Sequence, residues 1–237
     1  MPTPKMIKCK HCGMMLRPGT VICSYCGKKT GAKKAGSGGS ARSDSDAGFT
    51  IGDHFFPIPW VSLVILLLNI ATGVYMLIQG DRLVLNQYAM QQGSIEAGKW
   101  YRVFTSAFLH FTVPHFGTNM LSLVIYGFIF ENKISRWKYA LIYLLGIIGS
   151  GVMINFVGGN GLHAGASGAL WGLMTGALIW RIRSNTNPLH AVYGIISSLY
   201  YTFENFNISW QGHIGGGIAG LLISLMLFRK AEKGYTN

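Results

Sequence analysis

Long stretches without acidic residues constrain this chain more than any other feature. Trp60–Gln79 and Lys138–Val157 are each 20 residues long, and neither contains Asp or Glu. About 20 predominantly apolar residues are enough for one α-helix to cross the hydrocarbon core of a bilayer. Half of all residues are apolar and only 12% are charged, against about 25% charged in a typical soluble domain. The sequence therefore predicts an all-α, polytopic membrane protein.

Four further apolar blocks are shorter, and each has one polar end. They cover His115–Phe130, Ser167–Trp180, Leu189–Phe203 and His213–Phe228. At 14 to 16 residues, such blocks alone would suggest buried helices. Each reaches 18 to 21 residues when it is extended past its polar end, respectively to His110, Gly161, Phe206 and Ser209. We therefore expect six spans, four of them with a polar end.

The basic residues predict how these spans are oriented. Of the 20 Lys and Arg, seventeen fall on one side of a six-span arrangement, and Arg82, Lys99 and Arg102 fall on the other. The positive-inside rule makes the richer side cytoplasmic, with both termini there. The net charge of +12 then reflects topology and contact with anionic lipids, and nucleic-acid binding is the weaker interpretation. Charged and Gly/Ser-rich sequence before the first span argues against a cleavable signal peptide.

This orientation gathers the polar ends of the four shorter blocks at the outer half of the bundle. Spans two, four and six begin outside, and span five ends outside. Polar side chains at membrane depth are costly unless they line a wet cavity or bond one another. The sequence therefore predicts a water-filled cavity that opens outward and holds the functional site.

Four cysteines near the N-terminus have the spacing of a zinc site. They form C-x2-C-x10-C-x2-C, and each pair is followed by glycine: Cys9, Cys12, Cys23 and Cys26. Four thiolates suit a closed tetrahedral zinc site that is structural rather than catalytic. Two disulfides are the alternative, which a cytoplasmic location disfavours. We expect a cytoplasmic zinc ribbon at 1–28, similar to small ribbons on many bacterial chains, a flexible linker at 29–55, and the membrane domain at 56–237.

Glycine rows on two spans point to close helix packing around a serine and a histidine. The rows have a four-residue interval and consist of Gly168, Gly172 and Gly176 on span four and Gly212, Gly216 and Gly220 on span six. Such rows let two backbones approach closely. Ser167 precedes the first row and His213 follows the start of the second, so both would lie at one depth. Ser167 alone could be packing material, but opposite His213 it is a candidate nucleophile with a general base.

Further polar and aromatic residues could complete this site. His115 and Asn119 are four residues apart on span two, hence on one helical face. With the Ser167 N–H they could stabilise an oxyanion, although an interhelical hydrogen-bonded pair is the alternative. Trp171 could stack on the imidazole of His213 in place of a third catalytic residue. His110 has a structural role in this interpretation, and the parts played by His163 and Glu204 remain open.

Together these motifs resemble those of the rhomboid intramembrane serine proteases. "GASGALWG", which begins at Gly165, is similar to the family's G-x-S-G motif, and "GHIGGGIAG" to its H-x-x-G-x-x-x-G motif. "HFTVPHFGTN" is similar to H-x-x-x-x-H-x-x-x-N, and "WYR" to a Trp-Arg pair of the first outer loop, with Tyr101 inserted. The resemblance covers about Pro57 to Phe228. Trp171 stands where the family more often has Tyr or Phe.

The resemblance implies a six-helix rhomboid bundle that hydrolyses peptide bonds near the extracytoplasmic face. Ser167 and His213 would form the dyad, and His115, Asn119 and the Ser167 N–H would bind the oxyanion, without any cofactor for catalysis. Substrates would be single-pass transmembrane proteins in a bacterial cell membrane, and the Gly80–Arg102 loop would lie in the outer interface. Two alternatives are an inactive relative that binds membrane clients, and a small transporter, which would need polar positions reaching the inner side.

Overall fold

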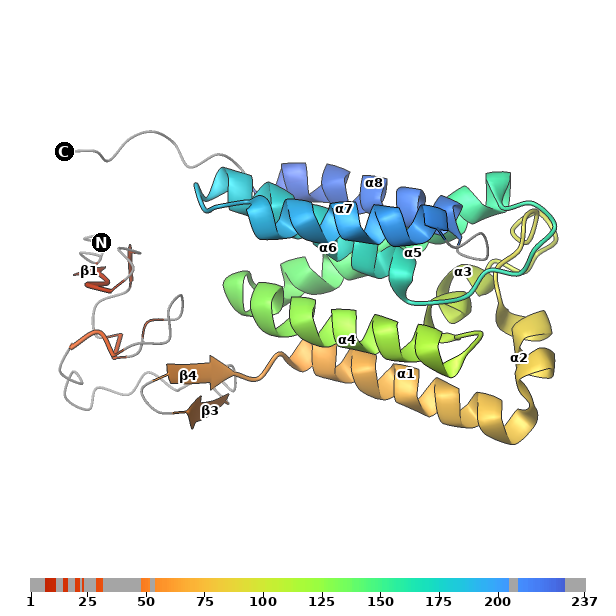
Figure 1. The fold of residues 1–237 in the computed structure, drawn as a ribbon, viewed down its shortest axis with the longest axis horizontal. Coiled ribbons are helices and arrows are strands. Elements are labelled where there is room, and N and C mark those ends of the chain that lie inside the picture. Colours follow the sequence, from red (N-terminus) through yellow and green to blue (C-terminus); the bar gives the residue numbers. More distant parts are fainter. Residues whose placement is uncertain are drawn as a thin grey trace.

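The computed structural model describes residues 7–11, 15–16, 20–21, 23, 29–31, 48–51, 54–204 and 209–228. Helices dominate the described part (Figure 1). The N-terminal part contains two hairpins, one of β1 (Ile7–Lys8) with β2 (Met15–Leu16) and one of β3 (Gly48–Ile51) with β4 (His54–Pro57). The second hairpin occupies the end of the segment that the sequence assigns to a linker.

Six helices of 16 to 22 residues form the bundle. They are α1 (Trp60–Gln79), α4 (Val113–Phe130), α5 (Arg136–Val157), α6 (Ser167–Arg183), α7 (Leu189–Glu204) and α8 (Trp210–Leu227). Among the described residues, α1, α5, α8 and α4 with the turn η3 (Glu131–Lys133) are long and apolar enough to cross a membrane. The 17-residue α6 and the 16-residue α7 are shorter.

The polar ends of the shorter blocks are not helical extensions at α4 and α6. α4 begins at Val113 rather than His110, because Thr112 caps it by accepting the His115 N–H at 3.2 Å. α6 begins at Ser167 rather than Gly161, since the preceding residues form an irregular loop. Ser167 therefore occupies the first turn of a short helix.

The first loop, between α1 and α4, contains α2 (Asp81–Tyr88), α3 (Arg102–Thr105) and the turn η2 (Ser106–Phe108). It is fixed to the bundle by Asn155 of α5, whose side-chain amide donates to Glu96 at 2.9 Å and whose oxygen accepts the Ile95 N–H. Arg102 is buried and donates to the Asn86 carbonyl at 2.6 Å. The first loop therefore has a defined structure and is held against the bundle by hydrogen bonds.

Helices α5, α6 and α8 pack together at the centre of the bundle, with α1 and α4 side by side on one flank and α7 against α6 (Figure 1). A Cβ atom at Gly216 would lie 2.0 Å from the Gly168 carbonyl oxygen, and one at Gly220 would lie 2.3 Å from that of Gly172. The predicted close approach of the two glycine rows is therefore present. By contrast, the outer face of α1 leaves large apolar side chains such as Leu67 and Leu77 exposed, as a lipid-facing helix does.

Glu131, at the end of α4, is a buried carboxylate that caps α1. Its two oxygens accept the N–H groups of Val61 and Ser62 at 2.9 and 2.8 Å, and Ser62 Oγ adds a bond of 2.7 Å. The first N–H groups of a helix have no partner within the helix, and a negative charge there is favourable. Glu131 thus ties α1 to α4 at the end of the bundle opposite the first loop.

Candidate active site

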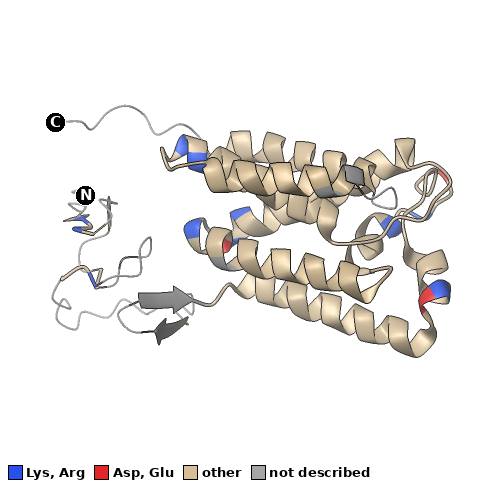
Figure 2. Cartoon of the chain, viewed as in Figure 1, with Lys and Arg blue, Asp and Glu red and all other residues tan. Residues whose placement is uncertain are grey.

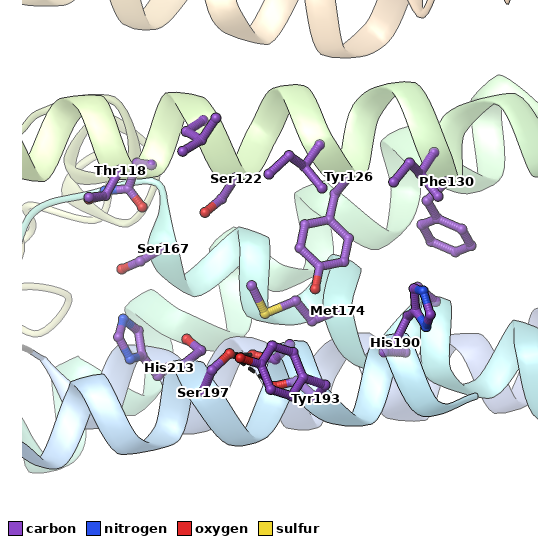
Figure 3. Close-up of a pocket in the computed structure, with 18 of the residues that line it drawn as sticks. Thr118, Ser122, Tyr126, Phe130, Ser167, Met174, His190, Tyr193, Ser197 and His213 are labelled. Carbon is purple, nitrogen blue, oxygen red and sulfur yellow. Dashed lines mark hydrogen bonds between the residues drawn. The ribbon is translucent and has the colours of Figure 1, made fainter. Parts of the chain in front are cut away.

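A cavity of about 590 Å³ runs between α4, α6 and α7 (Figure 3). Ser167 and His213 lie at one end of it, and His115 and Asn119 line the same end from α4. The structure therefore brings together the four side chains that the sequence analysis selected from three separate helices. Their convergence follows from the contact between the glycine rows, which sets the depth of α8 against α6.

His213 is almost completely buried, at 6% exposure, and two neighbours hold its ring. The indole of Trp171 is stacked on it, with ring centroids 5.4 Å apart and planes 18° from parallel. This is the stacking that the sequence analysis expected. Within the described part of the chain, His213 Nε2 is buried and has no hydrogen-bond partner. The ring thus has a fixed plane and one unused nitrogen.

The second neighbour, Thr202 of α7, was not predicted. Its Oγ1 lies 2.9 Å from His213 Nδ1, and its side chain is 5% exposed. The sequence signal is weak: a single threonine near the outer end of an apolar segment, with no fixed spacing to His213. Glu204 ends the same helix, but its side chain is outside the described residues.

The loop before α6 fits closely against α4. Gly165 has φ +136°, and a Cβ there would lie 2.8 Å from His115 Cε1 and 3.0 Å from His115 Nε2. Only glycine allows this conformation and this approach. Asn119 uses its amide to donate to the His115 carbonyl oxygen at 3.1 Å, which leaves one amide hydrogen for another acceptor. The Ser167 N–H is in the first turn of α6, where helical N–H groups have no intrahelical partner.

Two other histidines support the site from the side. His110 is buried and packs edge-on against His115, with ring centroids 5.1 Å apart. His163 uses both ring nitrogens, Nδ1 at 2.8 Å from Ser209 Oγ and Nε2 at 2.8 Å from the Gly158 carbonyl oxygen. Since a carbonyl only accepts, Nε2 donates to Gly158 and Nδ1 accepts from Ser209. His163 therefore joins the loop before α6 to the start of α8.

The far end of the cavity is more polar than the sequence suggested. Tyr126, Phe130 and His190 line it (Figure 3). Trp180 and Arg181, in the last turn of α6, also line the cavity. Tyr126 belongs to α4 and His190 to the first turn of α7. Polar side chains therefore extend along the cavity beyond the Ser167 end.

Comparison with known proteins places these features in a family. The model described as the Rhomboid domain matches residues 97–230. Over 146 residues the chain is 35% identical to the Rhomboid protease GluP of Bacillus subtilis (strain 168), which covers 59% of this chain and 28% of that protein. It is 32% identical over 143 residues to the Rhomboid-type serine protease 2 of Emericella nidulans, covering 55% of this chain and 27% of that protein.

A plant protein matches over a similar length. The RHOMBOID-like protein 1 of Arabidopsis thaliana is 27% identical over 149 residues, which covers 58% of this chain and 37% of that protein. The matched part of the chain thus spans between 27% and 37% of the length of these three relatives.

Proposed function

The chain belongs to the rhomboid family, since the family model covers more than half of it, and on this premise we propose that it is an intramembrane serine endopeptidase. It cleaves transmembrane-helix substrates near the extracytoplasmic face with a dyad of Ser167 and His213. The observation that carries this proposal is that both side chains line one end of a single cavity, with His213 Nε2 unpartnered among the described residues. Relatives whose names include serine protease or rhomboid protease support it.

The reaction follows the chemistry of a serine nucleophile with a histidine base. Ser167 Oγ attacks the carbonyl carbon of the scissile bond while His213 Nε2 takes its proton. The same nitrogen then gives the proton to the leaving amine, and an acyl-enzyme remains on Ser167. Water, deprotonated by His213, attacks the ester, and the proton returns to Ser167 as the new carboxyl end leaves.

The negative charge that develops on the carbonyl oxygen needs donors. The free amide hydrogen of Asn119, a ring N–H of His115 and the Ser167 N–H are assigned to this role. One such donor is worth about 3 kcal/mol in a water-excluded site. The approach of Gly165 to His115 supports the assignment, because it holds the loop before Ser167 against α4.

We further propose that α6 and α7 also cross the bilayer, which gives six spans with both termini cytoplasmic in a bacterial cell membrane. Figure 2 supports this topology, because the described basic residues gather at the two ends of the bundle. Lys133, Arg136, Lys138, Arg181 and Arg183 belong to the end that the positive-inside rule makes cytoplasmic. Cysteines introduced one at a time at Ser184 and Ala97, both exposed, in a variant whose four native cysteines are replaced by serine, test the orientation in intact cells. Only the cysteine at 97 should react with an impermeant reagent.

The N-terminal cysteines are assigned to a structural zinc ion. Cys9 and Cys23, one from each pair, are both buried and share a small cluster with Leu16. This fits a site that draws on both pairs, whereas Cys12 and Cys26 lie outside the described residues. Zinc would hold the ribbon together and take no part in proteolysis. Metal analysis of the full chain should find about one zinc per chain, and Cys23→Ser should lose it while retaining cleavage.

The experiment that tests the protease assignment uses the full chain in liposomes with a single-span test substrate. Wild type should cleave it, and Ser167→Ala should not. Ser184→Ala is the matched control, because Ser184 lies at the far end of α6, where its hydroxyl donates to the Trp180 carbonyl, and it should cleave as wild type does. Equal cleavage by wild type and Ser167→Ala would reject the assignment.

The same liposomes test the transporter alternative, which the polar residues at the far end of the cavity keep open. A transporter would release an enclosed solute equally well with Ser167 or alanine at that position. For a protease, no solute release should accompany cleavage. An inactive client-binding relative would retain the substrate without cutting it.

A further inference from the structure

The bond between Thr202 and His213 fixes more than the position of the ring. A neutral imidazole carries one hydrogen, on either Nδ1 or Nε2, and only the nitrogen without hydrogen can act as a base. A neighbour that can only accept at Nδ1 makes Nε2 the base, whereas a neighbour that donates to Nδ1 leaves the hydrogen on Nε2. The hydrogen bonds of Thr202 therefore decide whether His213 can activate Ser167.

Thr202 has already used its one hydrogen. Its Oγ1 lies 2.7 Å from the backbone carbonyl oxygen of Ser198, one turn earlier on α7. A carbonyl oxygen only accepts, so the threonine hydroxyl donates to Ser198. The same oxygen must then face His213 Nδ1 as an acceptor, at 2.9 Å. This arrangement requires the hydrogen of the neutral ring to be on Nδ1.

The rest of the ring agrees with this assignment. His213 Nε2 is buried and has no hydrogen-bond partner among the described residues, and the residue lines the same cavity as Ser167. A buried N–H without an acceptor would be costly. An unprotonated Nε2 can accept the proton of the Ser167 hydroxyl, as a general base must.

We propose that Thr202 is a positioning residue that holds His213 in the tautomer with hydrogen on Nδ1 and so makes Nε2 the catalytic base. The proposal rests on the proposed function. In a serine–histidine–aspartate triad a carboxylate accepts the Nδ1 hydrogen, and here a neutral hydroxyl on a third helix accepts it. Thr202 is on α7, whereas Ser167 and His213 are on α6 and α8. His213 therefore keeps its hydrogen on Nδ1 only while α7 packs against α6.

The test compares Thr202→Val, Thr202→Ser and Thr175→Val in the liposome assay. Valine has the shape of threonine but accepts no hydrogen bond, so the turnover number should fall about 10-fold, the equivalent of one neutral hydrogen bond. KM should stay within about twofold, because Thr202 acts through His213 rather than on bound substrate. Serine at 202 restores the acceptor, and its turnover number should return to within about threefold of wild type.

Thr175→Val is the matched control. Thr175 Oγ1 also makes an interhelical bond, to the Gly217 carbonyl oxygen at 2.9 Å, but it does not contact His213. This variant loses an interhelical hydroxyl bond that is partly buried and should keep the wild-type turnover number. A Thr202→Val turnover number equal to that of Thr175→Val, or Thr202→Ser as slow as Thr202→Val, would overturn the proposal.

A spectroscopic measurement on wild type removes any dependence on how well a variant folds. In protein labelled with ¹⁵N-histidine, the His213 signals are those that disappear in His213→Gln. They should show a protonated Nδ1 and an unprotonated Nε2 at neutral pH, and a mixture of both tautomers in Thr202→Val. Hydrogen on Nε2 in wild type would overturn this proposal even if Ser167→Ala is inactive, whereas an active Ser167→Ala would reject the protease assignment itself.

Discussion

The indole of Trp171 lies stacked on the imidazole of His213, with centroids 5.4 Å apart and planes at 18°. Trp171 is one turn after Ser167 on α6, so the helix that carries Ser167 also supplies the aromatic face against which His213 packs. The plane of the His213 ring is therefore set by α6, while Thr202 of α7 bonds its Nδ1 edge.

This stacking predicts a graded effect of substitutions at Trp171. The indole Nε1 is buried without a hydrogen-bond partner among the described residues, so Trp171→Phe keeps an aromatic face and loses no such bond. Its kcat/KM should stay within about threefold of wild type, whereas Trp171→Ala should lose about 10-fold, since an aromatic pair is worth about 0.5–1.5 kcal/mol. Thermal unfolding should accompany the kinetics, and equal kcat/KM values for Phe and Ala would contradict a role for the stacking.

The contact between α6 and α8 predicts that Gly216 tolerates no side chain. A Cβ there would be 2.0 Å from the Gly168 carbonyl oxygen, so Gly216→Ala must push the helices apart and should reduce the free energy of unfolding by about 1–3 kcal/mol. Gly73→Ala on α1 is the control, because its nearest neighbour is 3.9 Å away, and it should be neutral or slightly stabilising. Unfolding in detergent measures both, and equal losses would show that the helix spacing is adjustable.

The loop before Ser167 predicts a difference between two glycines with positive φ. Gly165→Ala would place Cβ 2.8 Å from His115 Cε1, whereas Gly159 has φ +69° and open space around it. Both variants carry backbone strain of about 1–3 kcal/mol, but only the first displaces His115. Cleavage by Gly165→Ala should fall by up to about 100-fold, as for a misplaced reacting group, and Gly159→Ala should cleave like wild type. Similar cleavage rates in the two variants would show that displacing His115 does not affect catalysis.

Because the His110 side chain is buried, we expect the protein to lose stability in acid. Burial, together with the neighbouring His115, lowers the pKa of His110 from 6.5 to about 4. Between these values the unfolded chain binds more protons than the folded one, so stability is complete above about pH 6.5 and falls as the pH drops toward 4. Melting temperatures in detergent across this range should show the decline, and His110→Gln should show a smaller one. An unchanged decline in His110→Gln would assign it to another group.

Sequence patterns were most informative where all the residues of a pattern lie on one helix. The glycine rows on α6 and α8 and the pair His115 and Asn119 repeat at four residues, which is the spacing of one helical face. Their faces could therefore be predicted before their partners were known, and the contact between Gly168 and Gly216 follows that prediction. The apolar block that begins at Ser167 matches the start of α6, but its extension to Gly161 was wrong, because apolar length does not reveal that 158–166 forms a loop.

The contacts between segments were beyond the sequence. Thr202 meets His213, His163 meets Ser209, and Gly165 meets His115. Each pair joins two elements whose relative rotation and depth are set by packing of the whole bundle. No spacing along one helix records such a meeting, so Thr202 and Ser209 looked like ordinary polar residues of an apolar chain, and the partners of the other residues could not be named.

The sequence by itself determined the apolar helical segments, the charge asymmetry and the residues able to act as nucleophile and base, because composition and helical period are local properties. Only the tertiary structure decided which side chains surround His213. That depends on how α6, α7 and α8 lie against one another, and Thr202, which bonds His213 Nδ1, comes from a helix that carries neither Ser167 nor His213.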